Sequence, residues 1–172
     1  MNTLSPELFE RAAKIRLLLV DCDGVLTDGR LYYSAEGEAL KVFDVQDGQG
    51  IVTWLGHGLR AGIISGRSSP IVGRRAADLK IDIVRQGVTD KLSSAIEVAA
   101  ESGVSLEETA FIGDDFVDLD VMAKVGLSVA VANAVDEVKA AAHLVTERSG
   151  GRGAVRELID VMLGCRGRSS DQ

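Results

Sequence analysis

Apolar segments of strand length recur along this chain and are separated mostly by segments with helical periodicity. The apolar segments are residues 15–20, 59–64, 81–84, 109–112 and 127–131. Such an alternation predicts an α/β fold, in which a Rossmann-like parallel sheet is flanked by helices. Because the carboxyl ends of parallel strands meet at one edge of the sheet, the residues that follow each strand are the first place to look for a site.

Composition limits the class of protein. A chain of 172 residues with 46% hydrophobic content can bury one substantial core, so we expect a single domain over residues 1–172. The net charge is −7 and no block of Lys or Arg occurs, which argues against a nucleic acid or an anionic membrane as partner. The short apolar run at 17–20 fits neither a signal peptide nor a membrane span, which favours a cytoplasmic protein. Cys22 and Cys165 lack the spacing of a metal site, so we interpret both as structural thiols.

Capping signals place several helix ends. Ser5, Pro6 and Glu7 predict the start of a helix that runs to about Ala13. Residues 105 and 108 form a predicted capping box, and the glycines at 103 and 126 are predicted to end helices.

One segment interrupts this alternation. Residues 31–34 and 39–43 flank a turn at 35–38, which predicts a β-hairpin inserted at about 30–43. A two-stranded ribbon cannot bury all its apolar side chains, so we expect a neighbouring subunit to cover those of Leu31, Tyr32, Tyr33, Val42 and Phe43.

Polar residues follow several of the predicted strands. Asp21 and Asp23 come after the first, Ser65 after the second, and Asp114 after the fourth, while Lys91 begins the helix after the third. Taken singly, each has an ordinary explanation as a turn, cap or solvated charge. Together at one edge, the carboxylates would repel one another unless a cation lay among them, and all-oxygen ligation favours Mg²⁺.

Two other kinds of acidic site do not fit this pattern. An EF-hand loop needs an oxygen ligand at its fifth position and glycine at its sixth, where this chain has Val25 and Leu26 after a strand. A response-regulator receiver has its adjacent acidic pair at the first strand, whereas here the pair Asp114 and Asp115 comes late.

The segments Asp21–Val25, Ser65, Lys91 and Gly113–Asp115 resemble the four motifs of the haloacid dehalogenase superfamily. Residues 23–29, 43–51, 65–67 and 150–157 resemble the 3-deoxy-D-manno-octulosonate 8-phosphate (KDO 8-phosphate) phosphatases, and the similarity spans about 15–163. The resemblance implies a capless, HAD-like phosphatase that acts on a small-molecule sugar phosphate. It also implies a cytoplasmic homotetramer in lipopolysaccharide precursor biosynthesis.

The expected roles follow residue by residue. Asp21 is the expected nucleophile and Asp23 the acid and base, while Ser65 and Lys91 would hold the phosphoryl oxygens. Asp21 and Asp114 would bind Mg²⁺, and the resemblance implies the backbone carbonyl of Asp23 as a further ligand, with Asp115 and Asp118 orienting the ligands. The resemblance implies substrate contacts at Asp23, Asp44, Val45, Gln46, Asp47, Gly48, Gly66, Arg67, Arg75 and Lys91. For Arg75, an exposed helix charge is the alternative interpretation.

The motifs are compatible with more than one sugar phosphate as substrate. Family members often carry Asn at position 44 and Arg at 46 and 52, where this chain has Asp44, Gln46 and Val52. A nonulosonate 9-phosphate of the sialic-acid type is the alternative substrate, although Arg67 favours the octulosonate because related nonulosonate phosphatases tend to be acidic there. A phosphate-binding scaffold without turnover is the third hypothesis, and the presence of Asp23 beside Asp21 argues against it.

Overall fold

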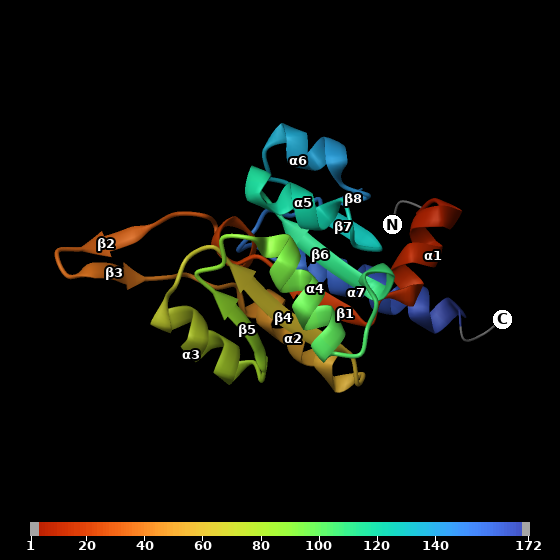
Figure 1. The fold of residues 1–172 in the computed structure, drawn as a ribbon, viewed down its shortest axis with the longest axis horizontal. Helices are drawn as coiled ribbons and strands as arrows, with labels where there is room; N and C mark the ends of the chain where they lie inside the picture. Colours follow the sequence, from red (N-terminus) through yellow and green to blue (C-terminus); the bar gives the residue numbers. More distant parts are fainter. Residues whose placement is uncertain (1–3, 170–172) are drawn as a thin grey trace.

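A six-stranded parallel sheet forms the centre of the computed structural model, which describes residues 4–169 (Figure 1). Its order is β5-β4-β1-β6-β7-β8, so the first strand lies in the middle and the chain crosses over it between β5 and β6. The strands are β1 (Leu17–Val20), β4 (Arg60–Ser65), β5 (Ile83–Gln86), β6 (Thr109–Gly113), β7 (Leu127–Ala130) and β8 (Leu144–Val145). This crossover makes the carboxyl end of β1 the natural ligand crevice of the sheet.

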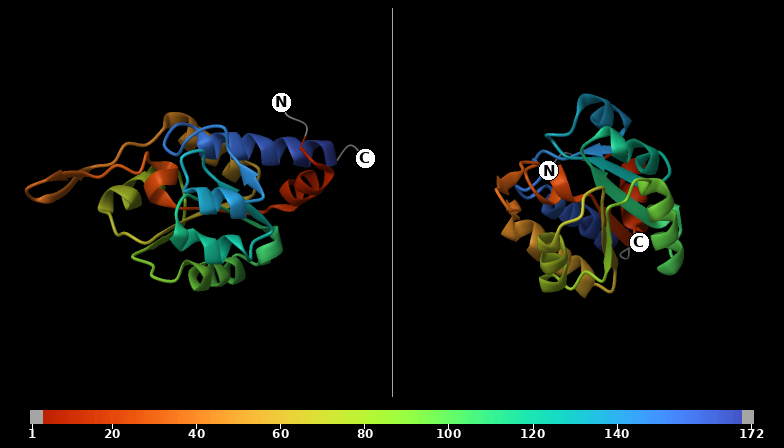
Figure 2. Two further views of the ribbon diagram at one scale, coloured as in Figure 1. Left: turned by 90° about the horizontal axis from the view of Figure 1, so that it is seen from above. Right: turned by 60° about the vertical axis from the view of Figure 1, so that its left-hand side comes forward.

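Helices cover both faces of this sheet (Figures 1 and 2). One layer holds α2 (Val45–Gly56) and α7 (Ala154–Ser169), with α1 (Pro6–Lys14) packed on α7. The other holds α4 (Lys91–Glu101) and α5 (Leu119–Met122). The remaining helices are α3 (Pro70–Asp78) and α6 (Asp136–Ala141), with short turns η1 (Cys22–Leu26), η2 (Leu106–Glu108) and η3 (Phe116–Asp118).

Burial is most complete on the central strand. All four side chains of β1 are inaccessible or nearly so, because helices pack on both sides of it. Each such Leu contributes about 1.5–3 kcal/mol through removal of its apolar surface from water. The strand register is fixed on both sides, with Val20 opposite Ile63 of β4 and Ile112 of β6. The residue after Val20 is therefore held by a rigid frame.

The predicted fold class is confirmed, and differences appear at element ends. Strand limits differ from the predicted ones by one or two residues, and β8 was not predicted because it has only two residues. The predicted helix start at Ser5 and the capping box of Ser105 and Glu108 are present. The prediction that Gly126 ends a helix is wrong: α5 ends at Met122, and Gly126 packs so closely on the backbone of Glu107 that a Cβ would collide with it.

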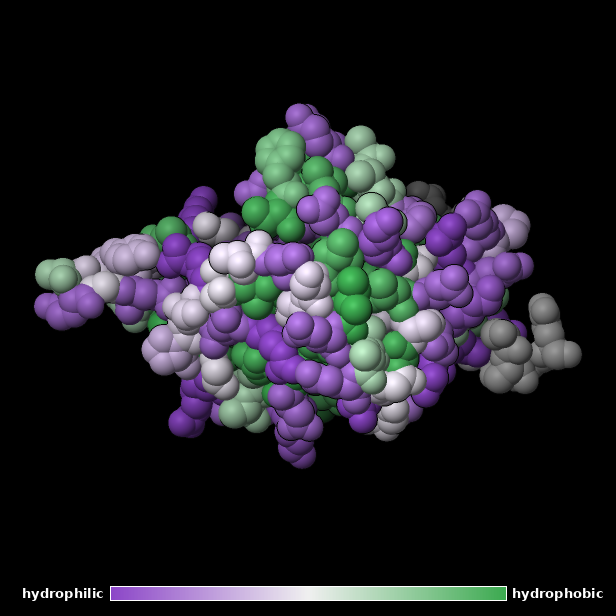
Figure 3. Space-filling view, in the orientation of Figure 1, coloured by the Kyte–Doolittle hydropathy of each residue, from purple (hydrophilic) through white to green (hydrophobic). Residues whose placement is uncertain are grey.

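The predicted hairpin consists of β2 (Tyr32–Ser34) and β3 (Gly37–Leu40), and it projects from the body of the molecule (Figures 1 and 3). Its turn is shorter than expected, because Gly37 already begins the return strand with a φ of 121°. The Ser34 hydroxyl donates to the Glu36 carboxylate at 2.7 Å and stabilises this tight turn. The end of the predicted second strand, from Lys41 onward, leaves the ribbon and returns to the sheet.

Candidate active site

The carboxyl edge of the sheet brings together most of the polar residues that were expected there. Asp21 directly follows β1, and its amide donates to the carbonyl of Ile112 at 3.1 Å, which extends the β1–β6 pairing by one residue. Ser65 is the buried last residue of β4, and Asp114 directly follows β6. Strands β4, β1 and β6 are adjacent, parallel and in register, so their carboxyl ends place these three residues at one edge of the sheet.

Lys91 is the first residue of α4 and lies buried between two carboxylates. Its Nζ is 2.8 Å from Asp21 Oδ1 and 2.6 Å from Asp118 Oδ1. Burial lowers the pKa of Lys91, but the negative charges of Asp21 and Asp118 outweigh this effect and the net shift is upward. Lys91 is therefore a protonated, fixed cation inside the crevice.

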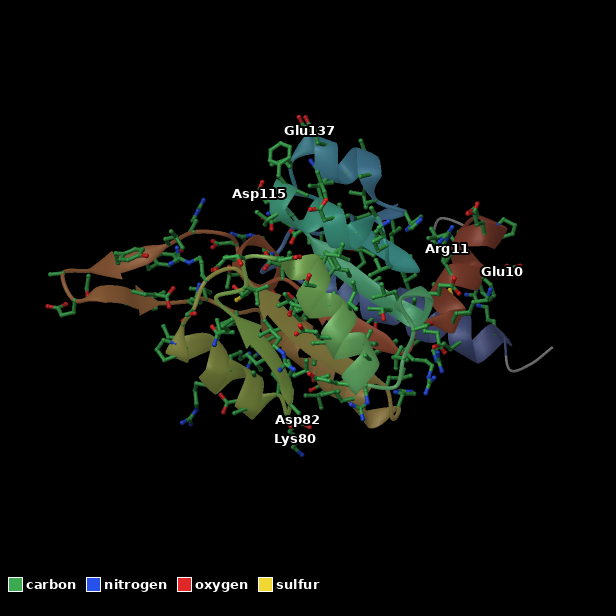
Figure 4. The ribbon with its side chains drawn as sticks, viewed as in Figure 1. Glu10, Arg11, Lys80, Asp82, Asp115 and Glu137 are labelled. Atoms are coloured by element: carbon green, nitrogen blue, oxygen red, sulfur yellow. The ribbon has the colours of Figure 1, made fainter. Side chains whose placement is uncertain are left out.

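Asp118 has no exposed surface, and both of its oxygens are engaged. Oδ1 accepts from Lys91, while Oδ2 accepts from the backbone amides of Asp114 at 2.9 Å and Asp115 at 3.2 Å. This arrangement fits the expected role of Asp118 in orienting its neighbours. Asp115 lies differently: its exposed carboxylate accepts from the amide of Phe116, and Figure 4 shows it at the rim near η3 and α5.

Asp21, Asp114 and Asp118 form a carboxylate cluster in which one oxygen of each lies within 4.8 Å of the others. Burial and the charge of Asp118 raise the pKa of Asp21 to about 6, against the opposing effect of Lys91. Burial, followed by repulsion from Asp21, Asp118 and Asp115, raises the pKa of Asp114 to about 8. Three acids thus face a single close cation, and within residues 4–169 no donor hydrogen-bonds to the Asp114 carboxylate.

This donor set fits a divalent hard cation. Its ligands are carboxylate oxygens without nitrogen or sulfur, which favours Mg²⁺ over zinc. Since Asp118 is fully engaged by Lys91 and two amides, the oxygens available to a cation belong to Asp21 and Asp114. A cation between these two would offset the repulsion that raises their pKa values.

Gly24 allows the chain after β1 to turn back within this confined space. Its φ is 92°, a conformation that residues with a side chain rarely adopt. A Cβ at this position would also collide with the carboxylate of Asp114. The glycine is therefore needed both for the turn and for the close approach of Asp114.

Asp23 contacts two cations, and one of them was missed by sequence reasoning. Lys41 Nζ forms an ion pair with Asp23 Oδ1, and Arg67 Nε lies 3.5 Å from Asp23 Oδ2. Glu38 of the hairpin forms ion pairs with both cations. Its Oε1 lies 3.1 Å from Lys41 Nζ and 3.7 Å from Arg67 Nη2. Burial lowers the pKa of Lys41, but its hydrogen bonds to Asp23 and Glu38 raise it by more. Neither periodicity nor a motif indicates Lys41, because its position depends on where the hairpin ends.

Comparison with known proteins adds an independent line of evidence. Residues 72–158 match the model of the haloacid dehalogenase-like hydrolase family. The 3-deoxy-D-manno-octulosonate 8-phosphate phosphatase of Haemophilus influenzae is 44% identical over 94% of this chain and 89% of its own length. This chain is a haloacid dehalogenase-like hydrolase. It also belongs to the family that contains this phosphatase.

Solved structures of relatives share the fold of this hydrolase. The crystal structure of the Yersinia pestis 3-deoxy-D-manno-octulosonate 8-phosphate phosphatase has a TM-score of 0.93 at 43% identity, covering 97% of this chain and 90% of that chain. The Moraxella catarrhalis enzyme, solved in complex with a magnesium ion, a phosphate ion and KDO, has a TM-score of 0.91 at 36% identity, covering 96% of this chain and 95% of that chain. No helix within residues 4–169 of the hydrolase has the length and apolarity needed to cross a membrane.

The residues expected to contact the substrate divide into two groups. Gly66 is exposed directly after Ser65, and the half-buried Arg67 also donates to the Tyr33 hydroxyl at 3.0 Å. Asp44 caps α2 by accepting from the Gln46 amide at 2.6 Å. Val45 is 80% exposed at the start of α2. Gln46 is exposed too, and its side chain accepts from Arg148 at 2.7 Å. These residues are open to a ligand or a partner.

Asp47, Gly48 and Arg75 make structural contacts within the chain. The buried Asp47 carboxylate accepts from the amides of Gly153 at 3.1 Å and Arg156 at 2.8 Å and so holds the start of α7. Gly48 is packed against the guanidinium of Arg75, so closely that a Cβ at this position would collide with it. The same guanidinium lies over the Phe43 ring, with Cζ 5.7 Å from the ring centroid. The substrate contacts of Asp47 and Gly48 stay predictions, and within the chain both residues have these structural contacts. Arg75 is also not the freely solvated charge of the alternative interpretation.

Proposed function

We propose that this hydrolase is a Mg²⁺-dependent phosphatase that converts 3-deoxy-D-manno-octulosonate 8-phosphate to KDO and phosphate. The observation that carries the proposal is the carboxylate cluster of Asp21, Asp114 and Asp118 around Lys91, at the carboxyl end of the central strand. The identity to the Haemophilus influenzae phosphatase, which extends over 94% of the chain, supports the choice of substrate.

In this mechanism Asp21 is the nucleophile. Its carboxylate attacks phosphorus, an aspartyl phosphate forms, and the bond between phosphorus and the sugar oxygen breaks. The rigid pairing of the backbone around Asp21 favours such a role, since the amide of Asp21 is still bonded to β6. A fixed nucleophile loses less entropy on reaching the transition state.

Asp23 is the proposed acid and base. It gives a proton to the departing sugar oxygen and then takes one from the water that attacks the aspartyl phosphate, so that Asp21 is regenerated and phosphate is released. Asp23 is half-buried two residues after Asp21, on the turn that Gly24 permits. Its carboxylate is in contact with Lys41 and Arg67.

The phosphoryl oxygens carry charge that must be offset. We assign Ser65 and Lys91 to these oxygens, with Lys91 already fixed by Asp21 and Asp118. Asp21, Asp114 and the backbone carbonyl of Asp23 would hold Mg²⁺, while Asp118 orients the loop that carries Asp114. When bound, Mg²⁺ neutralises the repulsion between the nucleophile and the phosphoryl group.

The remote part of the sugar is assigned to the residues that stay accessible. Arg67 lies beside Asp23 with 40% of its side chain exposed, which suits an anionic sugar better than an acidic residue would. Gly66, Asp44, Val45 and Gln46 are further candidates. Arg75 is a candidate only if binding of the substrate or of a second subunit draws it from Phe43.

We also propose that the hairpin assembles a homotetramer. Its exposed apolar side chains are Leu31, Tyr33, Leu40 and Val42, at 48%, 61%, 45% and 53% exposure. Phe43, which we expected to share this role, packs on the core of its own subunit and under Arg75. A cytoplasmic enzyme of lipopolysaccharide precursor synthesis is the cellular role that fits the proposed reaction.

A phosphate-release assay tests the proposal. The purified protein, treated with a chelator and resupplied with Mg²⁺, is offered KDO 8-phosphate, a nonulosonate 9-phosphate and simple sugar phosphates. We expect KDO 8-phosphate to have the highest kcat/KM. A preference for the nonulosonate would transfer the same chemistry to the alternative substrate. Binding of phosphate without turnover of any substrate would leave the scaffold hypothesis.

A further inference from the structure

We propose that Lys41 is a positioning residue that holds the carboxylate of Asp23 in place for proton transfer, an inference that rests on the proposed function. The Lys41 side chain is only 2% exposed, and its Nζ bridges Asp23 Oδ1 and Glu38 Oε1. Lys41 comes immediately after β3, eighteen residues beyond Asp23, so the hairpin returns this amine to the crevice.

A buried amine at this point calls for a specific reason. Taking a charged ammonium out of water costs free energy, and a buried ion pair seldom stabilises a protein more than apolar residues of similar volume would. Stability alone is therefore a weak explanation for Lys41. Its contact with Asp23 supplies a better one, because without Lys41 the remaining cation near the Asp23 carboxylate within residues 4–169 is the partly exposed Arg67.

The contacts of Asp23 explain why one cation is not enough. Arg67 is the other cation within reach, but its guanidinium is partly exposed and lies 3.5 Å from Asp23 Oδ2. It is also shared with the Tyr33 hydroxyl and Glu38. The Arg67 side chain is 40% exposed and so accessible to a substrate, whereas that of Lys41 is 2% exposed. Lys41 would keep Asp23 oriented while Arg67 moves.

Glu38 connects this pair to the rest of the molecule. In addition to Lys41, it accepts from the Ser69 hydroxyl, which belongs to the N-cap of α3. The base of the hairpin is thereby fixed between η1, which carries Asp23, and the loop after β4. The position of Asp23 consequently depends on a residue that only the folded hairpin can deliver.

The test uses the dependence of rate on the leaving group. A sugar phosphate needs a proton on its departing oxygen, whereas an activated aryl phosphate such as 4-nitrophenyl phosphate does not. We expect Lys41→Met to lower kcat for KDO 8-phosphate by about 10- to 100-fold, which is part of the roughly 10²- to 10⁴-fold that a general acid and base contributes. The same variant should change kcat for the aryl phosphate by less than about threefold, and KM for both substrates should change little.

Two further variants distinguish positioning from structural support. Lys41→Arg keeps the charge and should recover part of the lost rate on the sugar phosphate. In an Asp23→Asn background, Lys41→Met should cause no further loss on that substrate, because the group it positions is already disabled. Lys124→Ala, at an exposed lysine on the turn after α5, is the matched control and should behave as the wild type.

Different outcomes would contradict the role of Lys41 and the proposed function. Equal losses on both substrates, or full additivity with Asp23→Asn, would overturn the positioning role of Lys41. If Lys41→Met does not fold, as judged by its thermal unfolding midpoint, Lys41→Gln gives the same comparison with a polar side chain. Failure of the wild type to hydrolyse either substrate would instead contradict the proposed function. An active wild type with an unaffected Lys41→Met variant would contradict this inference alone.

Discussion

The crevice and the base of the hairpin both bury charges, but they do so in different ways. In the crevice, Asp21 and Asp114 follow strand ends and Lys91 begins a helix, so the parallel sheet and helix α4 bring them together. At the hairpin base, Asp23, Lys41 and Glu38 meet only because a projecting ribbon returns to the sheet. Charge balance differs as well, since the crevice has an excess of carboxylates that calls for a cation, whereas the hairpin base supplies its own.

Under the proposed mechanism, bond breaking takes place in the crevice, whereas proton transfer and substrate selection take place on the hairpin side. Substitutions in the crevice should therefore abolish turnover of every phosphate ester. Substitutions on the hairpin side should distinguish between esters.

The largest effect is expected from Asp21→Asn. The amide keeps the shape of the side chain but loses the nucleophile and one charge of the acidic cluster, so kcat should fall by about three orders of magnitude or more on sugar and aryl phosphates alike. Steady-state phosphate release measures the loss. Asp120→Asn, at an exposed position of α5, serves as the control. Activity retained within about tenfold in Asp21→Asn would rule out the covalent mechanism.

Removal of metal should have the next largest effect. Chelation should reduce turnover of both substrates by about a hundredfold or more, because the paired carboxylates would then repel the phosphoryl group. Mg²⁺ added back singly should restore activity. Ca²⁺ should inhibit, since a larger ion that takes more oxygen ligands can bind both oxygens of Asp21. Full activity in chelator alone would contradict the assignment of Asp21 and Asp114 as ligands.

The hairpin should give a smaller and selective effect. Replacing Leu40 and Val42 with Glu should yield smaller species by light scattering, because both side chains are exposed in the single chain. Turnover of the sugar phosphate should fall by about tenfold while that of the aryl phosphate stays within about twofold, since remote contacts to the sugar are lost first.

Ile96→Glu is the control for this experiment, because Ile96 is 48% exposed on α4, away from the hairpin. A wild type that is monomeric would contradict the proposed assembly. So would a dissociated double variant with unchanged turnover of the sugar phosphate.

The same contrast explains which parts of the site could be predicted from the sequence. Alternation of strands and helices implies one common edge, so the meeting of Asp21, Ser65, Lys91 and Asp114 could be predicted without coordinates. The ion pair of Lys41 with Asp23 could not, because it depends on the length of the hairpin and on where its turn lies. The inward turn of Asp47 was equally hidden: an acid at the start of a helix usually faces solvent, but here α7 begins against it.

The smallest predicted effect concerns the stability of the metal-free protein. The pKa of Asp114 rises from 3.8 to about 8 on folding, so the folded state binds more protons than the unfolded state between these values. Stability without metal should therefore decrease as the pH rises from about 4 to about 8, and Asp21 should act in the same direction up to about 6. Mg²⁺ competes with these protons, so its stabilising effect should grow over the same range.

Asp114→Asn isolates this effect, because it removes the titrating group and leaves the backbone contacts of the loop with Asp118 in place. At pH 8 the metal-free variant should unfold a few degrees above the metal-free wild type, since about 1 kcal/mol shifts Tm by roughly 2–4 °C in a domain of this size. The variant should also lose most of the stabilisation that Mg²⁺ gives the wild type. Hairpin substitutions such as Leu40→Glu should leave this pH dependence unchanged, because the hairpin contributes no group to the carboxylate cluster. A metal-free wild type whose Tm does not fall with rising pH would mean that Lys91 alone balances the crevice, and the contrast between the two regions would then disappear.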